Sequence, residues 1–158
     1  LRYHLGKQMK QKLQQQLFDK YPDIFKQKDL SAQETAMCWG IACGDGWYNL
    51  IDTLCENIQM RVNKVNRDRK QNRKDEPTTL VPTPTRTMVC EAVQVKEKYG
   101  GLRFYIQDSD EYIDGLISMA ESMSYKICTV CGNESQPQKS RGWIYTRCNS
   151  CSEETIKN

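Results

Sequence analysis

Two closely spaced pairs of cysteines constrain this sequence more than any other feature. Two residues separate Cys128 from Cys131, two separate Cys148 from Cys151, and sixteen lie between the pairs. This spacing lets one tight turn direct both sulfurs of a pair at one ion, and four thiolates in tetrahedral array typify a structural zinc site. The pattern therefore predicts a Zn²⁺ centre. Iron with the same ligands, two disulfides, or unrelated buried cysteines are the alternatives.

The residues around the two pairs predict the form of this zinc module. Gly132 follows the first pair, where the backbone often takes a positive φ angle. A polar loop at 136–142 is followed by a strand-like segment at 143–147, and the second pair leads into a helix start at 152–154. This order resembles a treble clef more than a ribbon of two equal knuckles. Four cysteine ligands leave no position for water, so we expect a structural rather than a catalytic metal.

The other cysteines bear on the cellular compartment. The chain has eight in total and no signal-peptide pattern, which favours a metal site in a reducing cytoplasm over the disulfides of a secreted protein. The four outside the pairs lack close spacing, and we expect them to be small buried hydrophobes. A second metal site is the alternative for these residues: Cys38, Cys43, Cys55 and Cys90.

Positive charge is concentrated in one segment, residues 61–74. It has seven basic residues and one acid, Asp68, for a net charge of +6, whereas the whole chain has +3 and the remainder therefore −3. An apolar helical stripe ends at Val65, so the helix either projects beyond the core into solvent or frays there. The candidate nucleic-acid or partner contacts in this segment are Arg61, Lys64, Arg67, Arg69, Lys70, Arg73 and Lys74.

Apolar periodicity predicts three helices. The first spans residues 9–20; the second follows Asp45 as its N-cap; and the third follows Asp108 or Ser109 as its N-cap. Residues 77–84 are rich in proline and threonine, and we expect them to form an extended linker because proline cannot continue a helix.

Alternating apolar residues at 93–106 predict a β-hairpin with the turn at Gly100-Gly101. In that register, the apolar side chains of both strands share one face. Lys96, Arg103 and Tyr105 lie on the other face, which mixes aromatic and basic residues and is a candidate surface for stacking on bases and contacting phosphates. The alternative is that these charges only solvate the outer face.

Together these elements predict an α+β fold: a small antiparallel sheet, formed by the hairpin, packed with amphipathic helices, plus a C-terminal treble-clef-like or ribbon-like zinc module. No apolar run approaches the roughly 20 residues that a membrane span needs. The expected divisions are an N-terminal helical region ending in the basic helix (1–76), a linker (77–87), a hairpin and helix (88–125), and the zinc module (126–158).

The sequence offers little for catalysis. Its one histidine, His4, precedes Met9, which we expect to be the natural start, with residues 1–8 lying upstream. No Ser–His–Asp or Cys–His arrangement exists elsewhere. The two glycines of the loop at 44–47 bring backbone amides within reach of a ligand, but a tight turn anchored by Trp47 is the simpler interpretation. We therefore expect neither an enzyme nor a small-molecule substrate.

Three segments carry a resemblance to a known group of proteins. Residues 43–55, residues 93–105 and the terminal cysteine pairs resemble small uncharacterised phage and prophage proteins with a C-terminal cysteine-knuckle module. The resemblance covers roughly residues 38–151 and implies a phage-type accessory protein in a bacterial cytoplasm. Small proteins of that kind often bind host machinery, including defence systems.

We therefore expect a non-enzymatic, zinc-stabilised, phage-type accessory binding protein. The leading partner is nucleic acid, or a host complex that contains nucleic acid, engaged through the basic helix and without a membrane. The alternative is a protein-binding inhibitor of a host bacterial defence complex, in which the same helix meets an acidic groove. A solvated helix end without a partner is the third interpretation of the same charges.

Overall fold

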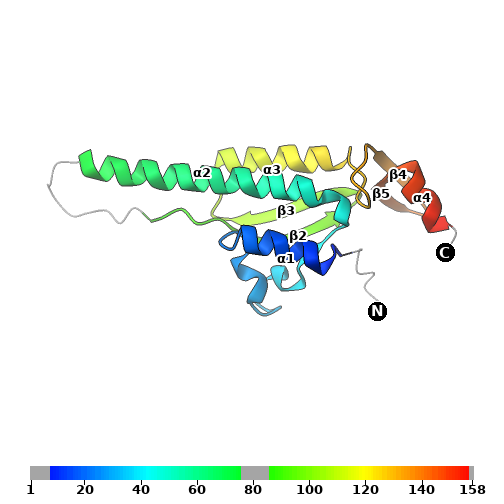
Figure 1. Ribbon diagram of the computed structural model, residues 1–158, viewed down its shortest axis with the longest axis horizontal. Coiled ribbons are helices and arrows are strands. Elements are labelled where there is room, and N and C mark those ends of the chain that lie inside the picture. Colours follow the sequence, from blue (N-terminus) through cyan, green and yellow to red (C-terminus); the bar gives the residue numbers. More distant parts are fainter. Residues whose placement is uncertain (1–7, 76–85, 157–158) are drawn as a thin grey trace.

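The computed structural model of the protein describes residues 8–75 and 86–156 (Figure 1). Their α-helices are α1 (Gln11–Lys20), α2 (Tyr48–Asp75), α3 (Glu111–Ser124) and α4 (Asn149–Ile156). Their strands are β1 (Ile41–Ala42), β2 (Glu91–Lys98), β3 (Gly101–Gln107), β4 (Gln136–Ser140) and β5 (Trp143–Arg147). Short 3₁₀ helices are η1 (Lys26–Asp29), η2 (Ala36–Trp39) and η3 (Asp45–Trp47). The fold is α+β, as predicted. None of the helices in the described residues has the length and apolar character that a membrane crossing requires.

The larger sheet has the order β1-β2-β3. The predicted hairpin is its antiparallel pair β2-β3, and β1 adds a short parallel strand that the sequence did not indicate. α3 covers the free edge of β3, because the N–H groups of Leu102 and Phe104 donate to Ser124 Oγ (2.8 Å) and Glu121 Oε1 (3.1 Å). These two contacts satisfy backbone donors on the outer edge of β3.

The turn of the hairpin lies one residue earlier than predicted. Lys98 pairs with Gly101, so the two turn residues are Tyr99 and Gly100, with φ angles of 52° and 77°. Gly101 belongs to β3 instead. A Cβ atom there would lie 2.2 Å from Cζ of Tyr125, so the aromatic ring occupies the space that any side chain at this position would need.

The apolar core joins the helices to one face of the β2-β3 pair. The predicted stripe of α2 and the residue before it supply Trp47, Ile51 and Ile58, which are fully buried. Val95 and Phe104 are paired across the two strands and are buried against these helices. α2 and α3 run side by side above the sheet (Figure 1), and the C-terminal part of α2 extends well past the N-terminal end of α3.

The start of α3 differs by one or two residues from the prediction. Asp110 is the N-cap, rather than Asp108 or Ser109, and its Oδ1 accepts a hydrogen bond from the Ile113 N–H at 3.0 Å. Asp108 has a φ angle of 58°, so it turns the chain after β3 and cannot open the helix itself.

The first helix agrees with its prediction, and its N-terminus is contacted by a residue that was predicted to cap the second helix. α1 occupies residues 11–20 of the predicted 9–20. Asp45, predicted to cap the second helix, lies in η3 before α2 begins. Its Oδ1 accepts a hydrogen bond from the Lys10 N–H at 2.8 Å. The carboxylate therefore satisfies a backbone donor at the start of α1.

The C-terminal segment contains a β-hairpin followed by a helix. The predicted strand at 143–147 is β5, but part of the segment predicted as a polar loop forms β4, its antiparallel partner. The first cysteine pair precedes this hairpin and the second lies at the start of α4. This order of knuckle, hairpin and helix is the treble-clef arrangement. Of the predicted linker 77–87, residues 77–85 lie outside the described residues, and the predicted domain boundaries stay predictions.

Candidate metal centre

The four paired cysteines converge on one point. The sulfur atoms of Cys128, Cys131, Cys148 and Cys151 all lie within 4.8 Å of one another, and Cys131 Sγ is 3.6 Å from Cys148 Sγ. A tetrahedral ion bound at about 2.3 Å from each sulfur requires sulfur–sulfur distances of about 3.8 Å. The cluster therefore has the dimensions of a four-coordinate metal site. It lies near the surface, with only Cys128 buried.

The protonation of these thiols favours a cation at their centre. Burial disfavours the thiolate of Cys128, but backbone N–H groups of Cys131, Cys148 and Val130 outweigh it and lower its pKa to about 6. Burial and the other three sulfurs raise the pKa of Cys151 instead. Negative charges held this close together repel one another. A bound cation removes that conflict, because it stabilises every thiolate at once.

The remaining cysteines are separate from this cluster. Cys43, Cys55 and Cys90 are buried, and Cys38 is half-buried. Burial raises the pKa of Cys55 well above its ordinary value, as expected of an inert core thiol. In the described part of the chain, the C-terminal cluster is the one group with metal-ligand geometry, and all eight cysteines are free of disulfides.

A glycine-containing loop before α2 holds the first cysteine pair in place. The Gly46 N–H donates to the Thr129 carbonyl at 3.0 Å, and Trp47 Nε1 donates to the Ile127 carbonyl at 2.8 Å. A Cβ atom at Gly46 would lie 2.1 Å from the carbonyl oxygen of Cys128. This glycine is therefore needed for the close approach of two backbones. The contacts agree with the structural interpretation of the loop.

The β2-β3 hairpin supports the metal module from a second side. Thr146, buried on β5, donates through Oγ1 to the Gly100 carbonyl at 2.6 Å. Its own carbonyl accepts from the Thr129 N–H at 2.9 Å. The Glu97 carboxylate accepts from Thr129 Oγ1 at 3.5 Å, and burial raises the pKa of Glu97 despite the nearby Arg147. The module is thus bound to the body by main-chain and hydroxyl contacts.

These supporting residues were missed in the sequence. One signal was available: the alternation of the hairpin places Glu97 opposite Leu102, on the core face, where an unexplained acid is unusual. Nothing local to Thr129 or Thr146 indicated their roles, because their partners lie 17 to 85 residues away along the chain.

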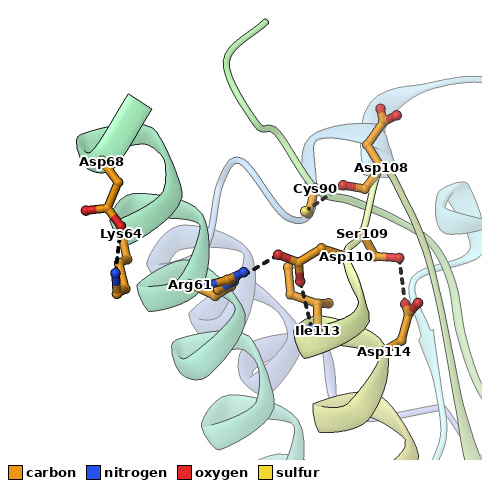
Figure 2. Close-up of polar contacts among 9 residues, drawn as sticks. All are labelled: Arg61, Lys64, Asp68, Cys90, Asp108, Ser109, Asp110, Ile113 and Asp114. Atoms are coloured by element: carbon orange, nitrogen blue, oxygen red, sulfur yellow. Dashed lines mark hydrogen bonds and ion pairs between the residues drawn. The ribbon is translucent and has the colours of Figure 1, made fainter. Parts of the chain in front are cut away.

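Among the described side chains of the basic segment, Arg61 and Lys64 form ion pairs within the molecule (Figure 2). Arg61 Nε lies 2.8 Å from Oδ2 of Asp110, and its guanidinium lies over the Tyr112 ring, 5.1 Å from the centroid. Lys64 forms an ion pair with Asp68 one turn later, at 2.6 Å. Arg61 therefore joins α2 to the start of α3, and the charge of Lys64 is offset locally.

The later turns of α2 present basic side chains to solvent. Arg67 and Lys70 are exposed and form no ion pair with any described residue. Arg69 is exposed too; its Nη1 donates to the Arg86 carbonyl at 2.6 Å, and it forms no ion pair with the residues that the structure describes. Two further predicted contacts have side chains outside the described residues: Arg73 and Lys74.

The predicted contacts on the hairpin differ in their surroundings. Arg103 donates to the Tyr125 hydroxyl at 3.1 Å and to the Leu102 carbonyl at 2.7 Å. Lys96 is half-buried, whereas Tyr105 is 42% exposed. The guanidinium of Arg103 thus helps to hold the end of α3, and a binding role for the three residues stays a prediction.

Comparison with known proteins gives no independent assignment. Protein-family models, curated proteins and solved structures all yield no match to this chain. The resemblance to phage and prophage proteins therefore stays a prediction.

Proposed function

We propose that the four-cysteine centre binds one Zn²⁺ and that this ion is structural. The support is the ligand set, because four cysteine sulfurs at tetrahedral spacing suit zinc and fill every coordination position. A filled coordination sphere has no place for a reacting water. The ion would stabilise the hairpin and α4 against the rest of the protein.

We further propose that the protein is a non-enzymatic accessory protein that binds nucleic acid, or a host complex containing nucleic acid, through α2. The observation that carries this proposal is the extension of α2 beyond the core with exposed basic side chains (Figure 1). Such a helix can follow a phosphate backbone without base contacts. A phage-type origin and a location in the bacterial cytoplasm stay predictions.

The ion pairs within the molecule determine how steeply the affinity for nucleic acid should fall with salt. Arg61 and Lys64 already form ion pairs within the molecule. Among the described basic side chains, those available to contact phosphates are therefore Arg67, Arg69 and Lys70. Each duplex phosphate neutralised contributes about −0.9 to the slope of log affinity against log salt. Three contacts give a slope of about −2.7, with little dependence on base sequence.

The experiment measures the affinity of the full chain for labelled duplex DNA across a salt series. The double variant Arg67→Gln/Lys70→Gln should flatten the slope by about 1.8, because two phosphate contacts are lost. Its melting temperature should not change, since both side chains are exposed and unpaired with any described residue. Lys12→Gln, an equally exposed lysine on α1, is the matched control and should leave the slope unchanged.

Failure to bind duplex and single-stranded DNA and RNA at low salt would contradict the proposal. Capture of partners from bacterial lysate, with and without nuclease treatment, distinguishes nucleic-acid binding from the main alternative, inhibition of a host protein complex. A protein partner that survives nuclease treatment and is lost with Arg67→Gln/Lys70→Gln would support the inhibitor alternative instead.

A further inference from the structure

An open cleft of about 530 Å³ lies beside the later turns of α2. One wall is α2 itself, with Arg61 and Arg69. The second wall is the segment at 86–89, which leads into β2, and the third is the turn at 108–110 between β3 and α3. The ion pair of Arg61 with Asp110 joins the third wall to α2 (Figure 2). The cleft is separate from the four-cysteine centre, and its volume is in the range of sites that bind a small molecule.

Hydrogen bonds from side chains of α2 to the main chain hold the first two walls together. The Asn66 side chain accepts from the Met88 N–H at 2.8 Å and donates to the Met88 carbonyl at 2.9 Å. One turn later, Arg69 Nη1 donates to the Arg86 carbonyl at 2.6 Å. The folded chain therefore forms the cleft by itself, and a ligand would not have to order its walls on binding. Such preorganisation favours affinity.

The charged side chains of the cleft favour an anion. They are three arginines, Arg61, Arg69 and Arg86, and two acids, Asp108 and Asp110, so the described lining has a net charge of +1. Arg69 forms no ion pair with the described residues. Arg86, with a side chain 85% exposed, lies 3.4 Å from Asp108, which is longer than a good charge-assisted hydrogen bond. A guanidinium has five N–H donors, so both arginines keep donors that suit the oxygens of a phosphate.

The remaining lining suits a nucleoside. Val65, Met88 and Val89 give the cleft an apolar surface against which a base can pack, and Val89 is 39% exposed. The exposed Asp108 carboxylate can accept hydrogen bonds from the hydroxyl groups of a sugar or the N–H groups of a base. An inorganic anion would use the arginines alone. A ligand that uses all three kinds of surface has a phosphate, a sugar and a base.

We propose that this cleft binds a nucleoside monophosphate, either as a free nucleotide or as the 5′-phosphorylated end of a nucleic-acid strand. The phosphate contacts Arg69 and Arg86, the base packs on the apolar side chains, and Asp108 accepts hydrogen bonds from the nucleoside. This site goes beyond the contacts of α2 with a phosphate backbone and does not depend on them. Arg67 lies about 200° around the helix from Arg69 and so points away from the cleft.

The test measures binding of AMP, GMP, CMP and UMP to the full chain by calorimetry. At least one of them should bind about tenfold more tightly than both inorganic phosphate and its own nucleoside, because each of those lacks part of the contacts. Arg86→Gln should weaken that binding about tenfold, because a charged hydrogen-bond donor is lost. Its melting temperature should not change, since the ion pair with Asp108 is exposed. Arg67→Gln removes an exposed arginine from another side of α2 and is the matched control, with unchanged nucleotide affinity.

Three results would overturn the proposal: no binding of any of the four nucleotides, equal affinity for a nucleotide and inorganic phosphate, or equal losses in Arg86→Gln and Arg67→Gln. Competition with a short RNA oligomer then identifies the source of the ligand. Displacement of the nucleotide by the 5′-phosphorylated oligomer, but not by the same oligomer with a 5′-hydroxyl, supports binding of a strand end. Displacement by neither supports a free nucleotide. Equal displacement by both would show that internal phosphates suffice, which also contradicts the proposal.

Discussion

The body of the protein and its metal module are stabilised in different ways. In the body, more than twenty apolar side chains from Met9 to Ala120 are buried, and they form one cluster. Among the module's side chains whose burial the structure describes, those of residues 126–152, the buried ones are Cys128, Thr129 and Thr146. Burial of apolar surface can hold the body together, but the module has too little of it. We therefore expect the module to depend on a bound metal ion and on hydrogen bonds to the body.

The largest effect should follow metal removal, and it should be confined to the module. In chelator, or in Cys148→Ser, we expect the amides of Thr129 and Gly132 to lose protection from hydrogen exchange, because the carbonyl groups that accept from them, those of Thr146 and Cys128, are positioned by the cysteine cluster. Amides of Ile51 and Ile58 in α2 should keep theirs. Cys38→Ser, which lies outside the cluster, is the control.

Loss of protection in α2 as well would show that body and module unfold together, which would contradict their being stabilised in different ways. Unchanged protection in the module after complete metal removal would show that apolar packing and hydrogen bonds suffice there.

A smaller effect should follow Gly46→Ala, which acts at the contact between the two regions. The added Cβ meets backbone atoms, the carbonyl oxygen of Cys128 at 2.1 Å and the amide nitrogen of Gly132 at 2.5 Å, so the knuckle must shift. We expect about 1–3 kcal/mol of lost stability and a weaker hold on the metal, measured by competition with a chelator. Gly115→Ala on α3 has open space and should be neutral or stabilising. Equal behaviour of the two variants would refute the contact.

Gly101→Val should destabilise the body without releasing the metal. The added side chain meets the Tyr125 ring, which can move aside. We therefore expect the free energy of unfolding to fall by about 1–3 kcal/mol, measured by thermal or denaturant unfolding. The double variant Gly101→Val/Tyr125→Leu should recover part of this loss. If it recovers none, the clash is not the cause.

The smallest effect concerns Asp110, which caps α3 and pairs with Arg61. Asp110→Ala should cost about 0.5–2 kcal/mol of unfolding free energy, and Asp110→Asn less, because asparagine keeps the cap. Burial opposes ionisation, but the Ile113 N–H and the Arg61 guanidinium hold the pKa of Asp110 below its usual value. Its contribution is therefore present above about pH 4 and lost as the pH falls through the folded pKa. A wild-type unfolding free energy for Asp110→Asn at pH 7 would contradict a role for the ion pair, and equal values for the two variants would contradict a role for the cap.

Local patterns in the sequence predicted the parts of the structure that local geometry decides. The Cys-x-x-Cys spacing is such a pattern, because a two-residue turn is enough to bring the sulfurs of one pair together. The apolar stripe of α2 and the alternation of the hairpin are others, since each reports one buried face.

Contacts distant in sequence decided the rest. The hairpin turn was misplaced because Gly101 is required by Tyr125, 24 residues later, and not by the turn. Arg61 was grouped with the free basic residues because its partner, Asp110, is 49 positions away. Likewise, the role of Gly46 depends on the backbone of Cys128, which no pattern near residue 46 reports.

Metal analysis of the purified full chain tests the central claim, that an ion held by four cysteines stabilises the C-terminal module. We predict about one zinc per chain in the wild type, loss of that zinc in Cys131→Ser, and an unchanged content in Cys38→Ser. Wild-type protein that contains no metal and still shows protected Thr129 and Gly132 amides would contradict the account.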